Sequence, residues 1–182
     1  MLRRDRADGI RFLAGLTVGG MVSGLLLSLV VVLLGGLAHA ALPEQARVAL
    51  LAGVCAILGI ADLADRTPHP WRQVPQKLIH RLSPGMRGVT WGVDLGLLVT
   101  TQKVASLVWA TIAAMVLLDP LAAPPLLVAM AIVSCLSVAV VSGQRIPFVV
   151  SNHGRDRRWL RLIRASAGAT LLLIAVINVL QT

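Results

Sequence analysis

The sequence contains no tyrosine, and aromatic residues make up only 3% of its 182 residues. Such a chain has little material for the stacked aromatic platforms on which proteins bind single-stranded nucleic acids. Its two cysteines, Cys55 and Cys135, lie far apart inside apolar runs and form neither a CxxC redox motif nor a zinc-ligand spacing. We interpret both as small hydrophobic core residues.

Charged residues are also scarce, at 14%, whereas apolar residues make up 57% and the mean hydropathy is +0.82. This balance is far from that of a soluble globular domain and indicates a membrane protein. The net charge of +9 does not indicate a nucleic-acid partner, because the basic residues gather in short segments between apolar runs. We expect these segments to contact anionic lipid headgroups.

Five apolar segments approach the roughly 20 residues that a helix needs to cross a bilayer. They cover residues 12–37, 46–63, 88–118, 121–143 and 162–180. The sequence therefore predicts an all-α bundle of about five transmembrane helices that forms a single integral membrane domain over residues 1–182. The first apolar run is longer than the roughly 7 to 15 residues of a secretory signal peptide, so we expect it to be retained.

The basic residues predict how this bundle is oriented. All but two of the 17 Lys and Arg residues lie before the first span, in or near the loop of residues 64–87, or in or near the loop of residues 144–161. Because basic loops favour the cytoplasmic side, we expect a cytoplasmic N-terminus in the plasma membrane. The candidate lipid contacts in these loops are Arg72, Lys77, Arg81, Arg155, Arg157 and Arg158.

The segment 88–118 differs from the others because it carries polar side chains within WGVDLGLLVTTQK. As one straight helix it would be about 46 Å long, against a hydrocarbon core of about 30 Å. It is therefore tilted, begins in the headgroup layer, or is broken near residues 100–102. We expect a polar pathway or binding site lined by Asp94, Thr100, Thr101, Gln102 and Lys103, with Ser134 or Asn178 contributing.

Two of these residues have alternative interpretations. Asp94 could form an interfacial ion pair with Arg87, Arg11 or Arg164. Lys103 could instead extend its ammonium group toward the membrane surface, or donate a hydrogen bond to a carbonyl.

Glycines recur at helical spacing in the first and third apolar segments. Gly88, Gly92 and Gly96 would lie on one side of a helix, and Gly15 and Gly19 do the same in the first segment. Surfaces of this kind let two helices approach closely in a membrane. We expect them to pack spans one and three together or to dock a partner.

Asp62 and Asp65 close the second segment just before Arg66, and we interpret them as a charge cluster at the inner interface. The chain contains no P-loop, dinucleotide fingerprint, nucleophile elbow or HExxH motif. We therefore expect no metal, no cofactor and no enzymatic activity. A membrane transferase that uses Asp62, Asp65 and the loop histidines is the third of the functions that we consider.

Three short motifs carry a resemblance to a known superfamily: Arg72-Gln73-Val74-Pro75, Gly92-Val93-Asp94-Leu95-Gly96, and Thr100-Thr101. Over about residues 70–118 the chain resembles actinobacterial membrane proteins of the CcdA/DsbD-like superfamily, of the cytochrome c biogenesis and methylamine-utilisation type. The resemblance implies transfer of reducing equivalents by two cysteines on separate spans. Cys55 and Cys135 lack the Pro- and Gly-flanked setting of such a pair, and would have to meet within about 7 Å between Cα atoms.

These features lead to two main hypotheses of function. The first is a non-enzymatic integral subunit or accessory protein of a larger transport or envelope assembly, which contacts another membrane protein or a second copy of itself. The alternative is a small transporter or transmembrane thiol-redox carrier that uses the polar stretch of the third span.

Overall fold

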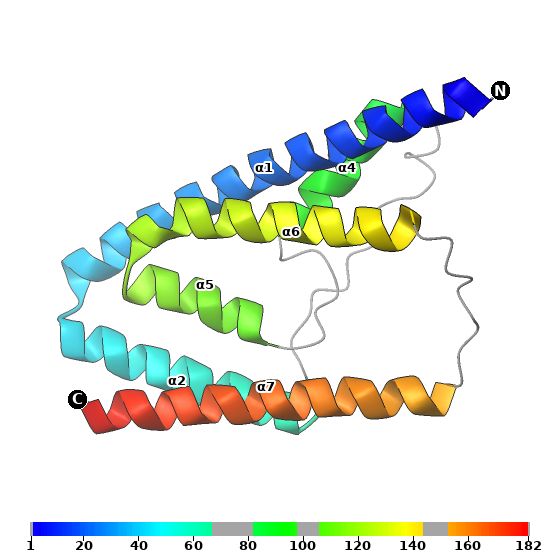
Figure 1. The fold of residues 1–182 in the computed structure, drawn as a ribbon. Coiled ribbons are helices and arrows are strands. Elements are labelled where there is room, and N and C mark those ends of the chain that lie inside the picture. The colour runs from blue at the N-terminus through cyan, green and yellow to red at the C-terminus, as the bar shows by residue number, and fades with distance from the viewer. Residues whose placement is uncertain (1, 67–81, 98–105, 144–152, 182) are drawn as a thin grey trace. The chain divides into compact units, whose positions relative to one another are not determined.

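The computed structural model describes residues 2–66, 82–97, 106–143 and 153–181 (Figure 1). Every regular element within these residues is helical, which confirms the predicted all-α class. The elements are α1 (Leu2–Ala41), α2 (Glu44–Leu63), α4 (Pro84–Gly96), α5 (Leu107–Leu117), the 3-10 turn η1 (Pro120–Ala122), α6 (Ala123–Gly143) and α7 (His153–Gln181).

Among the described residues, four helical stretches are long and apolar enough to cross a membrane, namely Ala7–Ala41, Glu44–Leu63, Pro120–Ser137 and Arg161–Leu180. Large apolar side chains are exposed along them, among them Leu29, Ile57 and Leu173, as expected for helices that face lipid. The protein is a multi-pass membrane protein, as the composition predicts.

The third predicted span is not one straight helix. Its described residues form two helices: α4 ends at Gly96, and α5, which is apolar but only 11 residues long, begins at Leu107. The Ser106 amide donates to the side chain of Asp62, so the ladder of helical hydrogen bonds does not run through this position into α5. The predicted break near residues 100–102 itself lies outside the described residues.

The chain packs as two compact units, whereas the sequence predicts a single domain. The α1–α4–α6 unit comprises residues 1–29, 70–101 and 124–147, and the α2–α5–α7 unit comprises residues 30–69, 102–123 and 148–182. The long helix α1 contributes residues to both units.

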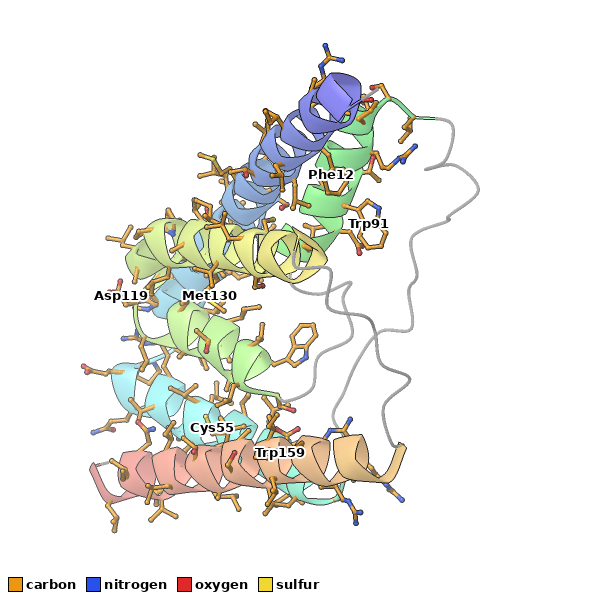
Figure 2. All side chains as sticks on the ribbon, turned by 45° about the vertical axis from the view of Figure 1, so that its right-hand side comes forward. Phe12, Cys55, Trp91, Asp119, Met130 and Trp159 are labelled. Atoms are coloured by element: carbon orange, nitrogen blue, oxygen red, sulfur yellow. The ribbon has the colours of Figure 1, made fainter. Side chains whose placement is uncertain are left out.

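In the α1–α4–α6 unit, α4 runs parallel to α1, because successive α4 positions contact successive α1 positions. A Cβ atom built on Gly88 would come within 3.0 Å of backbone atoms of Phe12 and Leu16, and one on Gly92 would meet Leu16 and Gly20 in the same way. Figure 2 shows the side chains of this unit, with Phe12 labelled on α1 and Trp91 on α4. The two helices therefore pack backbone against backbone.

Helix α6 packs antiparallel to α1. Gly20 of α1 lies against the Cys135 sulfur, and Gly24 lies against the backbone of Leu127 and Val128. The Cys135 thiol donates to the Leu16 carbonyl oxygen over 3.4 Å. Small residues on α1 thus allow both α4 and α6 to pack closely against it.

In the α2–α5–α7 unit, α7 runs antiparallel to α2, and α5 lies beside them (Figure 1). Gly59 of α2 and Gly168 of α7 face each other, since a Cβ on either would lie within 3.0 Å of the other's carbonyl oxygen. A buried apolar cluster fills the space between the three helices and consists of Leu51, Cys55, Ala110, Leu171 and Ala175.

Arg47 joins the other end of α5 to α2. Its Nη1 atom donates to the Leu117 carbonyl oxygen over 3.0 Å and lies 2.8 Å from Nδ1 of His39. A cation at the last carbonyls of a helix is favoured by the helix dipole. Since Asp62 binds the beginning of α5 and Arg47 its end, the short helix is held to α2 at both ends.

Candidate functional site

One face of α2 carries its buried residues, and the last of them is an acid. Leu51, Cys55, Gly59 and Asp62 follow one another at intervals of three or four residues, which places them on the same side of the helix. Asp62 is only 2% exposed. The apolar face of α2 therefore ends in a buried carboxyl group.

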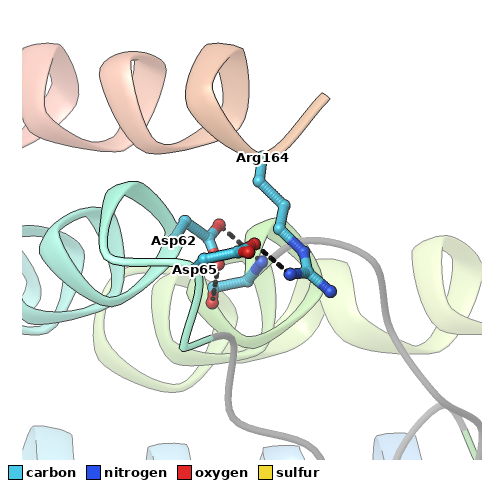
Figure 3. A network of polar contacts seen from close by, with 4 residues as sticks. Asp62, Asp65 and Arg164 are labelled. Carbon is cyan, nitrogen blue, oxygen red and sulfur yellow. Dashed lines mark hydrogen bonds and ion pairs between the residues drawn. The ribbon is translucent and has the colours of Figure 1, made fainter. Parts of the chain in front are cut away.

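The partner of Asp62 is Ser106, which directly precedes α5 and is itself fully buried. The Ser106 amide donates to Oδ2 of Asp62 over 2.8 Å, and the Ser106 hydroxyl donates to Oδ1 over 2.7 Å. Figure 3 shows Asp62 beside Asp65 and Arg164. Both carboxyl oxygens thus accept a hydrogen bond from the same residue.

The position of this carboxyl group is electrostatically favourable. A negative charge at the N-terminal end of a helix interacts well with the helix dipole, and Asp62 supplies the acceptor that the side chain of an N-cap residue usually provides. Placing an ionised carboxylate in a protein interior nevertheless costs several kcal/mol. Two hydrogen bonds to a charged group, worth about 1.5–3 kcal/mol each, offset much of this cost.

Asp65 lies in a different environment, although it is only three residues from Asp62. It adopts a left-handed backbone conformation, with φ of 59°, directly after α2 ends. Its carboxylate forms an ion pair with Arg164 of α7, and its side chain is 56% exposed (Figure 3). The two acids therefore differ in their surroundings, because Asp62 belongs to the buried face of α2 whereas Asp65 follows the end of that helix. Their placement at the inner membrane interface stays a prediction.

The predicted polar pathway is described only in part. Asp94 is partly buried on α4, while Thr100, Thr101, Gln102 and Lys103 lie outside the described residues. The Ser134 hydroxyl and the Asn178 amide each donate to a carbonyl four residues earlier in their own helix. Of the cations proposed as partners for Asp94, Arg11 pairs with Asp8 and Arg164 with Asp65.

Of the six predicted lipid-contacting residues, three lie within the described part of the chain. Arg72, Lys77 and Arg81 lie outside the described residues, whereas Arg155, Arg157 and Arg158 belong to the first turns of α7.

Both cysteines are free and buried, and they belong to different units. Cys55 is part of the apolar cluster between α2, α5 and α7, and Cys135 packs against Gly20 of α1. Each therefore occupies a site where a small side chain fits.

The glycines that the sequence offered for docking or core packing lie against helices of the same unit. Backbone or side-chain atoms of a neighbouring helix lie within 3.0 Å of a Cβ built on any of Gly15, Gly19, Gly88, Gly92 and Gly96. These surfaces are filled by α1 and α4 themselves, which leaves no room on them for a partner helix.

Comparison with known proteins adds no relative. No protein-family model, no curated protein and no solved structure matches this chain. The resemblance to the CcdA/DsbD-like superfamily therefore stays a prediction. Within the part of the chain that the structure describes, no three His, Cys, Asp or Glu side chains are grouped so that they could hold a metal ion.

The Asp62–Ser106 pair is what sequence reasoning missed. The spacing of Leu51, Cys55, Gly59 and Asp62 was a signal that Asp62 continues a buried face. Nothing in the sequence comparably marks Ser106 as its partner, since the two residues are 44 positions apart.

Proposed function

We propose that this protein is a small proton carrier of the plasma membrane, and that the Asp62 carboxyl group binds the proton. The observation that carries the proposal is the burial of Asp62 against Ser106 at the beginning of a helix too short to cross the membrane. Ionisable side chains inside membrane proteins are rare and costly, and they commonly mark ion or proton pathways.

The geometry of the pair supports two protonation states without movement of the heavy atoms. When Asp62 is ionised, it accepts from both the amide and the hydroxyl of Ser106. When Asp62 is protonated at Oδ1, its O–H donates to the Ser106 hydroxyl oxygen, and the serine hydrogen rotates away. The amide hydrogen bond persists in both states, so α5 keeps its attachment to α2 while the proton binds and leaves.

The same contacts favour a proton over a metal cation. Each oxygen of Asp62 already faces a hydrogen-bond donor of Ser106. A metal ion bound at Oδ2 would meet the positive end of the Ser106 N–H dipole at close range, whereas a proton needs only the reversal of one hydrogen bond.

The broken third span also fits a carrier. Transporters place their ion sites at helices that are interrupted within the membrane, where backbone groups and half-helix ends become available for binding. Here α5 is such a half-length helix, and Asp62 binds at its N-terminal end. With the N-terminus in the cytoplasm, Asp62 lies at the cytoplasmic end of the second span.

The proposal is tested by proton flux into liposomes that contain the purified full-length protein and a pH-sensitive dye. A potassium gradient with valinomycin sets the membrane potential, and the wild type is expected to acidify the lumen faster than protein-free liposomes do. Asp62→Asn should reduce this flux to the protein-free rate. The asparagine can accept from the Ser106 amide and donate to its hydroxyl oxygen, so this variant keeps the fold but holds no titratable group.

The matched control is Asp65→Asn, which removes a nearby carboxylate that is exposed and paired with Arg164. We expect this variant to keep the wild-type flux. Equal flux through wild type and Asp62→Asn, or equal losses in both variants, would contradict the proposal.

A further inference from the structure

A groove opens between residues 11–18 of α1 and the beginning of α4, within the α1–α4–α6 unit. It has a volume of about 430 Å³ and is lined on α1 by Arg11, Ala14 and Val18, and on the other side by Ser83, which precedes α4, and by Pro84 and Val89 of α4. The groove and Asp62 belong to different units of the chain.

The groove has polar groups at one end and apolar walls along the rest. The Arg11 side chain is 70% exposed, and within the described residues it forms an ion pair with Asp8 over 3.5 Å, an exposed contact that holds the guanidinium only weakly. Ser83 precedes α4, and within the described residues its hydroxyl makes no capping hydrogen bond to that helix. A cation and a hydroxyl thus stand together beside an apolar surface.

The apolar walls are continuous with the lipid-facing side of α1. Val18 and Val22 are exposed to 54% and 47%, and they carry the apolar surface from the groove along the helix. Arg11 stands at the beginning of this apolar stretch, where the sequence places the inner membrane surface. A molecule that fits this arrangement has an anionic head and a hydrocarbon tail.

We propose that this groove binds one anionic phospholipid of the inner leaflet. The phosphate group contacts Arg11 and Ser83, and an acyl chain lies along Ala14, Val18 and Val89. An arginine near the membrane surface contributes about 1 kcal/mol toward an anionic headgroup, which corresponds to about a fivefold difference in affinity. The tail is bound by burial of its hydrocarbon.

The test is native mass spectrometry of the delipidated full-length protein titrated with phosphatidylglycerol, and separately with phosphatidylcholine. We expect one phosphatidylglycerol to bind more tightly than phosphatidylcholine, and Arg11→Gln to weaken it about fivefold. Val18→Trp should also weaken binding, because the indole occupies the groove while Arg11 stays in place. Inorganic phosphate in excess should not displace the lipid, since it lacks the tail.

Two matched variants control for general effects. Arg66→Gln removes another exposed arginine outside the groove, and Ile57→Trp adds an indole at an exposed apolar position of α2, in the other unit. Both should bind phosphatidylglycerol as the wild type does. Loss of binding in Arg66→Gln equal to that in Arg11→Gln, unchanged binding in Arg11→Gln and Val18→Trp, or displacement by phosphate would overturn the assignment.

Discussion

Replacement of Gly92 by alanine tests the packing of α1 against α4 most sharply. A Cβ at this position would lie 2.8 Å from the Gly20 nitrogen and 2.9 Å from the Leu16 carbonyl carbon, where ordinary contact begins at 3.4 Å. It would come closer still to the Leu16 carbonyl oxygen. All three atoms belong to the α1 backbone, which cannot yield as a flexible side chain does.

The size of the effect follows from this geometry. The two helices have to separate by more than half an ångström, and a gap of about 0.5–1 Å forfeits a quarter to a half of each neighbouring dispersion contact. Insertion of a single methyl group into such a tight interface costs typically about 1–3 kcal/mol. We expect Gly92→Ala to lower the free energy of unfolding by this amount.

The measurement is unfolding in mixed micelles by titration with sodium dodecyl sulfate, followed by far-ultraviolet circular dichroism. The control is Gly36→Ala on α1, because among the described residues no atom of another element lies within 4 Å of a Cβ at that position. Alanine is the better helix former by about 1 kcal/mol, so the control should be neutral or slightly stabilising. If Gly92→Ala is as stable as Gly36→Ala, the glycine contact between α1 and α4 is refuted.

Three further predictions use the same protein preparation. Asp62→Ala should lower the free energy of unfolding by about 2–4 kcal/mol, because the buried amide and hydroxyl of Ser106 lose their acceptor. Asp62→Asn keeps an acceptor and should lower it by less than about 1 kcal/mol. Equal losses in the two variants would contradict the hydrogen-bonding account. Arg164→Gln removes an ion pair with the largely exposed Asp65 and should cost less than about 1 kcal/mol in the same titration, and a larger loss would show that the pair is not a surface contact. Neither Cys55 nor Cys135 should react with maleimide until the protein is unfolded, because both are buried. The reaction is measured by the mass shift of the protein, and rapid labelling of the folded protein would contradict the buried placement of the two thiols.

The long helices could be predicted from the sequence because hydropathy alone determines them. A run of 18 or more apolar residues has to become a helix in a bilayer, since no water is present to bind its backbone groups. The glycine spacing likewise indicated where α1 and α4 approach each other. Both inferences use local patterns, such as the four-residue repeat of Gly88, Gly92 and Gly96, which a single sequence displays.

The break in the third span and the candidate site could not be predicted in the same way. The length of residues 88–118 required a distortion but did not choose among tilt, a surface start and a break. The described residues end one helix at Gly96 and start the next at Leu107, with Ser106 held by Asp62. That hydrogen bond joins residues far apart in the chain, and no periodicity within either segment encodes it.

The central claim is that Asp62 binds and releases a proton inside the membrane protein. Infrared difference spectroscopy of the protein in lipid bilayers, with ¹³C-labelled aspartate, measures this directly as the pH is cycled within the range where the protein stays folded. The account predicts a carboxylic-acid band that appears and disappears with pH and is absent from Asp62→Asn but present in Asp65→Asn. A difference spectrum that is unchanged by Asp62→Asn would contradict it.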